Sequence, residues 1–152
     1  MHSGVVRPQS RGRLRLTGPH PLDPLQIEAN LLGHPDDLKA ARACVALCRE
    51  IGHSAALRPF VKREVMPGNL QGAALDHFIR DAVMTYSHET CTAKMGRDAM
   101  SVVDGSLRVY GIDHLRIADG AIMPRVTTGN TMAPCVIIGE RAAAILRAAH
   151  RL

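Results

Sequence analysis

The sequence predicts an α+β protein, in which an antiparallel sheet is combined with helices. Two short segments near the start alternate apolar and polar residues, which is the period-two pattern of a half-buried strand. Two later stretches repeat apolar residues at about every 3.6 positions, the period of a helix with one apolar face, and the carboxy-terminal segment is nearly all apolar. Because the two periodicities occupy separate parts of the chain, both kinds of element are expected.

The two expected strands cover residues 13–17 and 25–29. The first reads Arg-Leu-Arg-Leu-Thr and the second Leu-Gln-Ile-Glu-Ala. Residues 18–21 between them read Gly-Pro-His-Pro, and Pro24 follows. Because proline and glycine interrupt regular structure, we expect a turn rather than a helix between the strands.

The first expected helix runs from Pro35 to Gly52. Pro35 fixes a helical backbone angle in the first turn, and the two aspartates after it place negative charge where the helix dipole favours it. Gly52 is a common residue at the end of a helix. The apolar residues of this segment, which form one broad face, are Leu38, Ala41, Cys44, Val45, Leu47, Cys48 and Ile51. The two cysteines are therefore expected to be core residues rather than ligands.

The remaining elements are expected after the Pro67-Gly68 turn. Residues 70–85 predict a second helix, with His77 on its outward side. Residues 102–110 predict a hairpin around Asp104-Gly105-Ser106, and residues 115–118 predict the next strand. The final helix is expected from about 133 to 149, and because its side chains are nearly all apolar we expect it to be deeply buried.

The composition excludes several classes of function. The net charge is +5, but the basic residues are scattered and only 3% of residues are aromatic, so nucleic-acid binding is not expected. The four cysteines form no disulfide framework, which predicts a reduced, cytoplasmic protein. No secretory signal is visible, and no apolar run approaches the roughly 20 residues needed for a membrane span. His88 and Cys91 resemble half of a metal site, but no second ligand pair accompanies them, so no metal is expected.

Residues 86–140 carry the densest group of polar and glycine residues. Three motifs stand there in order: HETCTAKMG at 88–96, VVDGSLRVYGIDHLRIADGAIMP at 102–124 and TTGNTMAPCVIIGERAA at 127–143. They resemble the carboxy-terminal signature of the glucose–methanol–choline (GMC) family of flavoprotein oxidoreductases, and choline dehydrogenase-like alcohol dehydrogenases are the most similar branch. Residues 8–14, PQSRGRL, are similar to the start of the family's substrate domain.

The resemblance implies a domain organisation and a cofactor, FAD. Residues 1–85 are expected to form part of a substrate-binding cap domain, and residues 86–152 a segment that completes an FAD-binding α/β domain. The family's Gly-x-Gly-x-x-Gly loop for the pyrophosphate does not occur in this sequence. We therefore expect a fragment, a split gene product or a subunit whose partner is the missing N-terminal FAD-binding part. A homo-oligomer is also possible.

His88 and Asn130 are the candidate catalytic residues. By resemblance, His88 occupies the position of the family's active-site histidine, and histidine suits a base because its pKa lies near the working pH. Asn130 fills the position that holds Asn or a second His, from which an amide can donate to the substrate oxygen. The alternatives are a hydrogen-bonded loop histidine for His88 and a left-handed turn residue for Asn130.

Flavin contacts are expected, again by resemblance, from Asp119, Gly120, Asn130, Thr131 and Met132. The residues after Asn130 lead into the final helix, whose N-terminal N–H groups suit the pyrimidine edge of a reduced, anionic flavin. The alternative for Asp119-Gly120 is a simple turn at the end of a strand.

Together these features predict the carboxy-terminal part of an FAD-dependent dehydrogenase or oxidase that acts on the CH–OH group of a small alcohol. The rival hypothesis is a non-catalytic binding or assembly module with the same fold. The absent pyrophosphate loop favours the rival, and the family motifs favour the enzyme.

Overall fold

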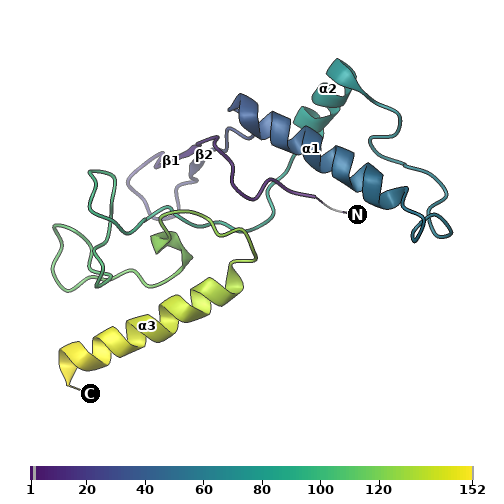
Figure 1. Cartoon of the computed structure of the whole chain (residues 1–152). Helices are drawn as coiled ribbons and strands as arrows, with labels where there is room; N and C mark the ends of the chain where they lie inside the picture. Colours follow the sequence, from purple (N-terminus) through teal and green to yellow (C-terminus); the bar gives the residue numbers. More distant parts are fainter. Residues whose placement is uncertain (2, 152) are drawn as a thin grey trace. The chain divides into compact units, whose positions relative to one another are not determined.

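The computed structural model describes residues 1 and 3–151 of the chain. Residues 2 and 152, one in each predicted domain, lie outside the described residues. The chain divides into two compact units, Met1–Tyr86 and Ser87–Leu152. Figure 1 shows the helices and strands of both along the chain. The assignment of these units to a cap domain and an FAD-binding domain stays a prediction.

The N-terminal unit contains a two-stranded antiparallel sheet. Strands β1 (Arg13–Arg15) and β2 (Gln26–Glu28) pair with Leu14 opposite Ile27. The predicted strands are thus confirmed, although both are shorter than expected. All their residues are exposed, so the expected half-burial is wrong. The reason is that the helices of this unit pack against each other rather than against the sheet.

Helices α1 (Pro35–Gly52) and α2 (Gly72–Ala82) form the core of this unit. Both predicted helices are confirmed, and the chain leaves α1 where Gly52 was expected to end it. This core is a cluster of buried aliphatic side chains from both helices and from the loop before α1: Leu32, Leu38, Leu75 and Ile79. His77 is exposed on α2, as predicted.

A buried carboxylate ties the first residues of the chain to α1. Asp37 accepts hydrogen bonds from the backbone N–H groups of Gln9 and Ser10, both at 2.7 Å, and from the Ser10 hydroxyl. Burial raises the pKa of Asp37, but these hydrogen bonds outweigh it and hold the pKa below its ordinary value. Ser10 Oγ also accepts from the backbone N–H of His34 at 3.0 Å, next to the helix start.

The C-terminal unit is built mainly from turns. It contains a 3-10 turn, η1 (Gly120–Ile122), and one long helix, α3 (Met132–His150). The predicted hairpin is present as a single bridge, Val103 to Val109, rather than as regular strands. The strand predicted at 115–118 is likewise reduced to the bridge between Arg116 and Arg108. The hydrophobic core of the C-terminal unit consists of Val103, Leu107, Ile122 and Ala142.

The expected deep burial of α3 is wrong. Of its residues only Ala142 is buried, whereas Val136 and Ile137 are 56% and 67% exposed. One face of the helix packs on the core through Ala142, and the other apolar face is uncovered in this chain. No helix among the described residues is both long and apolar enough to span a bilayer.

Candidate active site

The segment that carries His88 lies beside the Asp119-Gly120 turn. The backbone N–H groups of Cys91, Ala93 and Met95 donate to the carbonyl oxygens of residues 120, 121 and 122, at 3.2, 2.9 and 2.7 Å. On its other side the segment bridges to the hairpin, since Met95 pairs with Val103. The backbone thus brings two of the predicted motifs together.

Gly120 is closely packed inside this unit. A side-chain Cβ built there would lie 3.1 Å from both Cys135 Sγ and Thr90 Cγ2, closer than ordinary van der Waals contact. The neighbouring Asp119 accepts a hydrogen bond from the N–H of Ala121 at 2.7 Å and so caps η1. The turn interpretation of Asp119-Gly120 therefore has direct support, and a role in flavin binding stays a prediction.

Cys91, three residues after His88, has a backbone conformation that favours glycine. Its φ is 71°, in the left-handed region that costs an L-residue free energy.

His88 and Asn130, which stand 42 positions apart, meet at the centre of the site. His88 Nε2 lies 3.0 Å from Asn130 Oδ1, and the other ring nitrogen, Nδ1, lies 2.9 Å from the carbonyl oxygen of Ser87. His88 is partly buried and Asn130 is exposed. The structure therefore brings together the two residues predicted to be catalytic.

Both contacts of the ring favour its charged form. The amide oxygen of Asn130 and the carbonyl of Ser87 can only accept hydrogen bonds, and the imidazolium is the form in which both ring nitrogens donate. The bond to Asn130, the bond to Ser87 and the negative charge of Glu89 raise the pKa of His88 above its ordinary value, against a smaller opposing effect of burial. A base whose conjugate acid is stabilised in this way is suited to take up a proton.

The alternative for Asn130 does not hold. Residues with positive φ in this unit include Ser87, Cys91, Leu107 and His114, but not Asn130. Asn130 is therefore no left-handed turn residue, and its side chain is engaged with His88.

Thr131 and Met132 lie at the start of α3, as predicted. Thr131 is the N-cap residue, yet its side chain makes no capping hydrogen bond, and no acidic residue stands in the first turn. Backbone N–H groups at an uncapped helix start suit an anionic group. The start of α3 is therefore suited to the anionic part of a flavin, and the contacts of Thr131 and Met132 with FAD stay a prediction.

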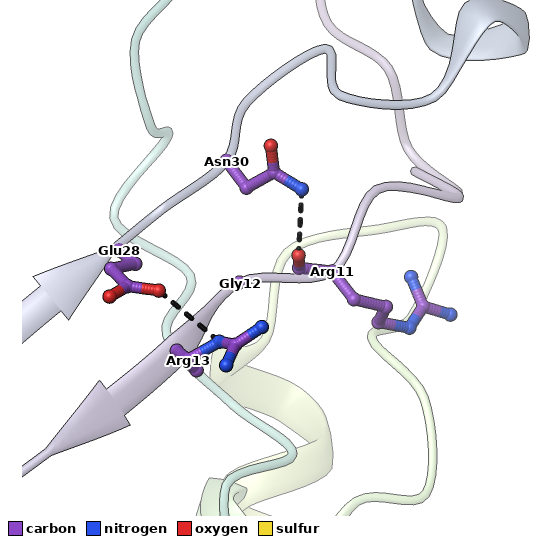
Figure 2. Close-up of a pocket in the computed structure, with 5 residues that line it drawn as sticks. All are labelled: Arg11, Gly12, Arg13, Glu28 and Asn30. Carbon is purple, nitrogen blue, oxygen red and sulfur yellow. Dashed lines mark hydrogen bonds and ion pairs between the residues drawn. The ribbon is translucent and has the colours of Figure 1, made fainter.

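Sequence reasoning missed Ser87 and the packing role of Thr90 and Cys135. No composition signal marks them, because Ser87 contacts His88 through its backbone carbonyl and the other two residues act through their position beside Gly120. A shallow hollow of about 410 Å³ lies in the other unit, lined by Arg11, Gly12, Arg13, Glu28 and Asn30 (Figure 2). It includes none of the predicted site residues.

The chain belongs to the GMC oxidoreductase family, whose carboxy-terminal sequence pattern matches residues 8–139. It is 42% identical over 151 residues to the oxygen-dependent choline dehydrogenase of Stenotrophomonas maltophilia strain R551-3, covering 97% of this chain and 27% of the relative. The corresponding protein of Pseudomonas fluorescens strain SBW25 is also 42% identical, over 96% of this chain and 26% of its own length. The chain thus spans about a quarter of these relatives.

Solved structures show the same fold. Pyridoxine 4-oxidase from Mesorbium loti superposes with a TM-score of 0.87 at 36% identity, covering 91% of this chain and 28% of that one. Formate oxidase from Aspergillus oryzae RIB40 superposes with a TM-score of 0.89 at 25% identity, over 97% and 26% of the two chains. Members of this family are FAD-dependent oxidoreductases.

Proposed function

We propose that this chain supplies the proton-abstracting site of an FAD-dependent alcohol dehydrogenase or oxidase. The observation that carries the proposal is the contact between His88 Nε2 and Asn130 Oδ1, made by two residues from separate family motifs. The family membership supports it, and so does the uncapped start of α3 that follows Asn130 directly.

Oxidation of an alcohol removes a hydride from carbon and a proton from oxygen. FAD, when bound, supplies the hydride acceptor. His88 accepts the hydroxyl proton at Nε2, and the Asn130 amide holds the resulting N–H through Oδ1. The Nδ2 group of the same amide is a pure donor and can hold the substrate oxygen. Thr131 and Met132 offer the start of α3 to the flavin.

The substrate in this proposal is a small alcohol. The relatives and structures that the chain matches are named for choline, pyridoxine and formate. The partner is an FAD-binding part that carries the Gly-x-Gly-x-x-Gly loop. The four cysteines carry no disulfide, which supports a reducing, cytoplasmic location.

The test uses the assembled enzyme, meaning this chain co-expressed with the upstream FAD-binding segment. The assembled enzyme is expected to show flavin absorption and to oxidise alcohol, whereas the chain alone is expected to lose FAD in gel filtration. His88→Ala, Asn130→Ala and the double variant then form a mutant cycle in kcat/KM.

Because the two residues act on one proton, we expect the double variant to lose much less than the product of the two single losses. A matched control is His77→Ala, which removes an exposed histidine from α2. Fully multiplicative losses at His88 and Asn130 would show that the pair does not act as a unit.

A further inference from the structure

Residues 53–71 connect α1 to α2 and contain no helix or strand (Figure 1). Four apolar side chains within seven positions of this connecting loop are exposed, Phe60 by 82%, Val61 by 40%, Val65 by 69% and Met66 by 74%. Transfer of such side chains from water to an apolar environment is favourable. A group of them exposed together therefore marks a surface for interaction.

The backbone of the connecting loop is fixed by hydrogen bonds. The N–H groups of residues 57 and 58 donate to the carbonyl oxygen of Ser54 at 3.1 and 3.0 Å, and those of residues 60 and 61 to the carbonyl oxygen of Leu57 at 2.9 and 3.1 Å. Near α2, the guanidinium of Arg49 donates to the carbonyl oxygens of residues 68 and 70 at 2.8 and 3.0 Å. The apolar side chains are thus presented by a hydrogen-bonded segment.

The connecting loop carries a net positive charge. Arg58, Lys62 and Arg63 are exposed, and no carboxylate among the described residues forms an ion pair with them. Glu64 is the only acidic residue of the loop, and both of its carboxylate oxygens lie 3.1 Å from Arg49 Nε. The charge of Glu64 is therefore neutralised by α1, and three positive charges of the loop are available to a partner.

Other exposed apolar side chains have different surroundings. Leu22 is 85% exposed, but Asp23 follows it directly. Met100 is 77% exposed, and Asp98 stands two positions before it. An acidic residue beside an apolar side chain repels an anionic surface, so these positions do not fit the same partner as the connecting loop.

We propose that the connecting loop binds the surface of an anionic lipid bilayer. Phe60, Val65 and Met66 enter the boundary between headgroups and acyl chains, and the three basic side chains lie among the lipid phosphates. Apolar and basic side chains together bind such a boundary through burial and through attraction to anionic lipids. Arg63 and Val65 also line a shallow hollow of about 470 Å³, so that a positive and an apolar side chain meet where a headgroup would lie.

A bilayer fits these residues better than two other partners. In a two-fold contact between copies of the chain, the same patch faces itself, so Lys62 and Arg63 would approach the same positive charges of the second copy. Single-stranded nucleic acid binds through several stacked aromatic rings, whereas Phe60 is the only Phe, Tyr or Trp of the loop. The cytoplasmic face of a cell membrane, in contrast, carries anionic lipids.

The first experiment uses the absence of tryptophan from the chain. Phe60→Trp places a single fluorescent reporter in the connecting loop, and Leu22→Trp places one at a comparably exposed control position. With vesicles of mixed phosphatidylglycerol and phosphatidylcholine, the emission of Phe60→Trp should shift to shorter wavelength, whereas that of Leu22→Trp should not. Vesicles of phosphatidylcholine alone should leave both unchanged. An unshifted Phe60→Trp, or equal shifts in the two variants, would overturn the proposal.

The second experiment measures binding to the mixed vesicles by sedimentation. Phe60→Ser should weaken binding roughly 10-fold through lost apolar burial. Lys62→Gln combined with Arg63→Gln should weaken it roughly 25-fold, and added salt should weaken binding of the wild-type chain. Leu22→Ser is the matched control and should bind like the wild type. Circular dichroism checks that each variant is folded, and full binding by both loop variants would contradict the proposal.

The same sedimentation with the assembled enzyme separates a membrane site from a surface that another protein covers. We expect the assembled enzyme to bind the mixed vesicles as the chain does. If only the isolated chain binds, the FAD-binding part covers the loop and the proposal is wrong. If Phe60→Ser changes the oligomeric state in light scattering but not vesicle binding, the loop joins copies of the chain and the proposal is also wrong. Neither result bears on His88, because vesicle binding does not involve alcohol oxidation.

Discussion

The two units of the chain form their cores from different kinds of element. The N-terminal unit packs two amphipathic helices, so that Leu38 of α1 and Ile79 of α2 share one cluster. In the C-terminal unit, Val103 of the hairpin and Ile122 of the 3-10 turn form one hydrophobic cluster with Ala142 of α3. The difference shows that the unit with the candidate catalytic pair is built from turns and backbone hydrogen bonds with a single helix packed on them, rather than from two helices packed on each other.

Turns place side chains in a way that helices do not. In the turn-built unit, polar side chains from segments far apart in the sequence meet, as His88 and Asn130 do. A helix presents side chains at fixed spacing, which suits a core and leaves fewer ways to bring distant polar groups together. The comparison therefore predicts different sensitivities in the two units.

The largest expected effect on stability is in the core of the turn-built unit. Ile122 is 1% exposed, and Ile122→Ala should lower the free energy of unfolding by about 2–5 kcal/mol through lost burial and a cavity. Urea denaturation followed by circular dichroism measures the loss. The control is Ile112→Ala in the same unit, where the side chain is 55% exposed and the change should stay within about 0.5 kcal/mol. Equal effects at the two positions would show that this unit has no fixed core.

A smaller effect is expected from the buried carboxylate of the N-terminal unit. Asp37→Ala leaves the N–H groups of Gln9 and Ser10 without their acceptor and should cost about 1–3 kcal/mol. Asp36→Ala, at an exposed position beside it, should cost less than about 1 kcal/mol. A loss no greater than that of the control would mean that Asp37 does not anchor the first residues.

The same carboxylate predicts that the folded chain loses stability in acid. The pKa of Asp37 in the folded chain is below its ordinary value of 3.8, so its contribution to stability is complete above pH 3.8 and is lost as the pH falls through the folded pKa. Asp37→Ala should therefore reduce the difference between denaturation midpoints measured at pH 6 and at about pH 3. An unchanged difference would assign the acid response to other groups.

Replacement of cysteine by glycine is expected to change the free energy of unfolding in opposite directions in the two units. Cys48→Gly lies inside α1 and should cost roughly 0.3 kcal/mol through helix propensity, together with the burial lost at this half-buried position. Cys91→Gly relieves a φ of 71° and should gain up to about 1 kcal/mol, whereas Cys91→Ala should gain nothing. Urea midpoints of the three variants test this. A loss at both cysteines would contradict the account of the Cys91 backbone.

The smallest expected effect is a change in the pKa of His88. Asn130→Ala removes the oxygen that accepts from protonated Nε2, so the pKa of His88 should fall toward its ordinary value of 6.5. NMR titration of the His88 ring measures it, with Asn69→Ala as an exposed control. An unchanged pKa, or one that rises, would show that the contact with Asn130 does not stabilise the charged ring.

Sequence patterns predicted the helical unit better than the turn-built one. The Pro35 start, the 3.6-residue period and Gly52 sufficed for α1, because local chemistry decides those features. The apolar character of α3 did not predict its exposure, because the sequence of a helix does not show which other residues cover its apolar faces. The expected hairpin was present, but its pairing reduces to single bridges that depend on contacts with η1 and the His88 segment.

The site was predictable only in part. The contact between His88 and Asn130 spans 42 positions, so no local pattern could reveal it, and the family resemblance alone suggested both residues. The left-handed φ values of Ser87 and Cys91, 54° and 71°, are likewise not indicated by their residue types. Residue types indicate which chemistry is possible, whereas backbone conformation decides which atoms meet.

The measurement that tests the central claim most directly is the anaerobic rate of flavin reduction by alcohol across a pH series, in the assembled enzyme. The wild-type rate should rise with pH as His88 loses its proton, with a midpoint above 6.5, because its contacts raise the pKa. His88→Ala should lower the rate by about 10²- to 10⁴-fold and abolish that rise while flavin stays bound. If His88→Ala keeps both the rate and the pH profile, another group takes the proton and the proposed role of His88 is wrong.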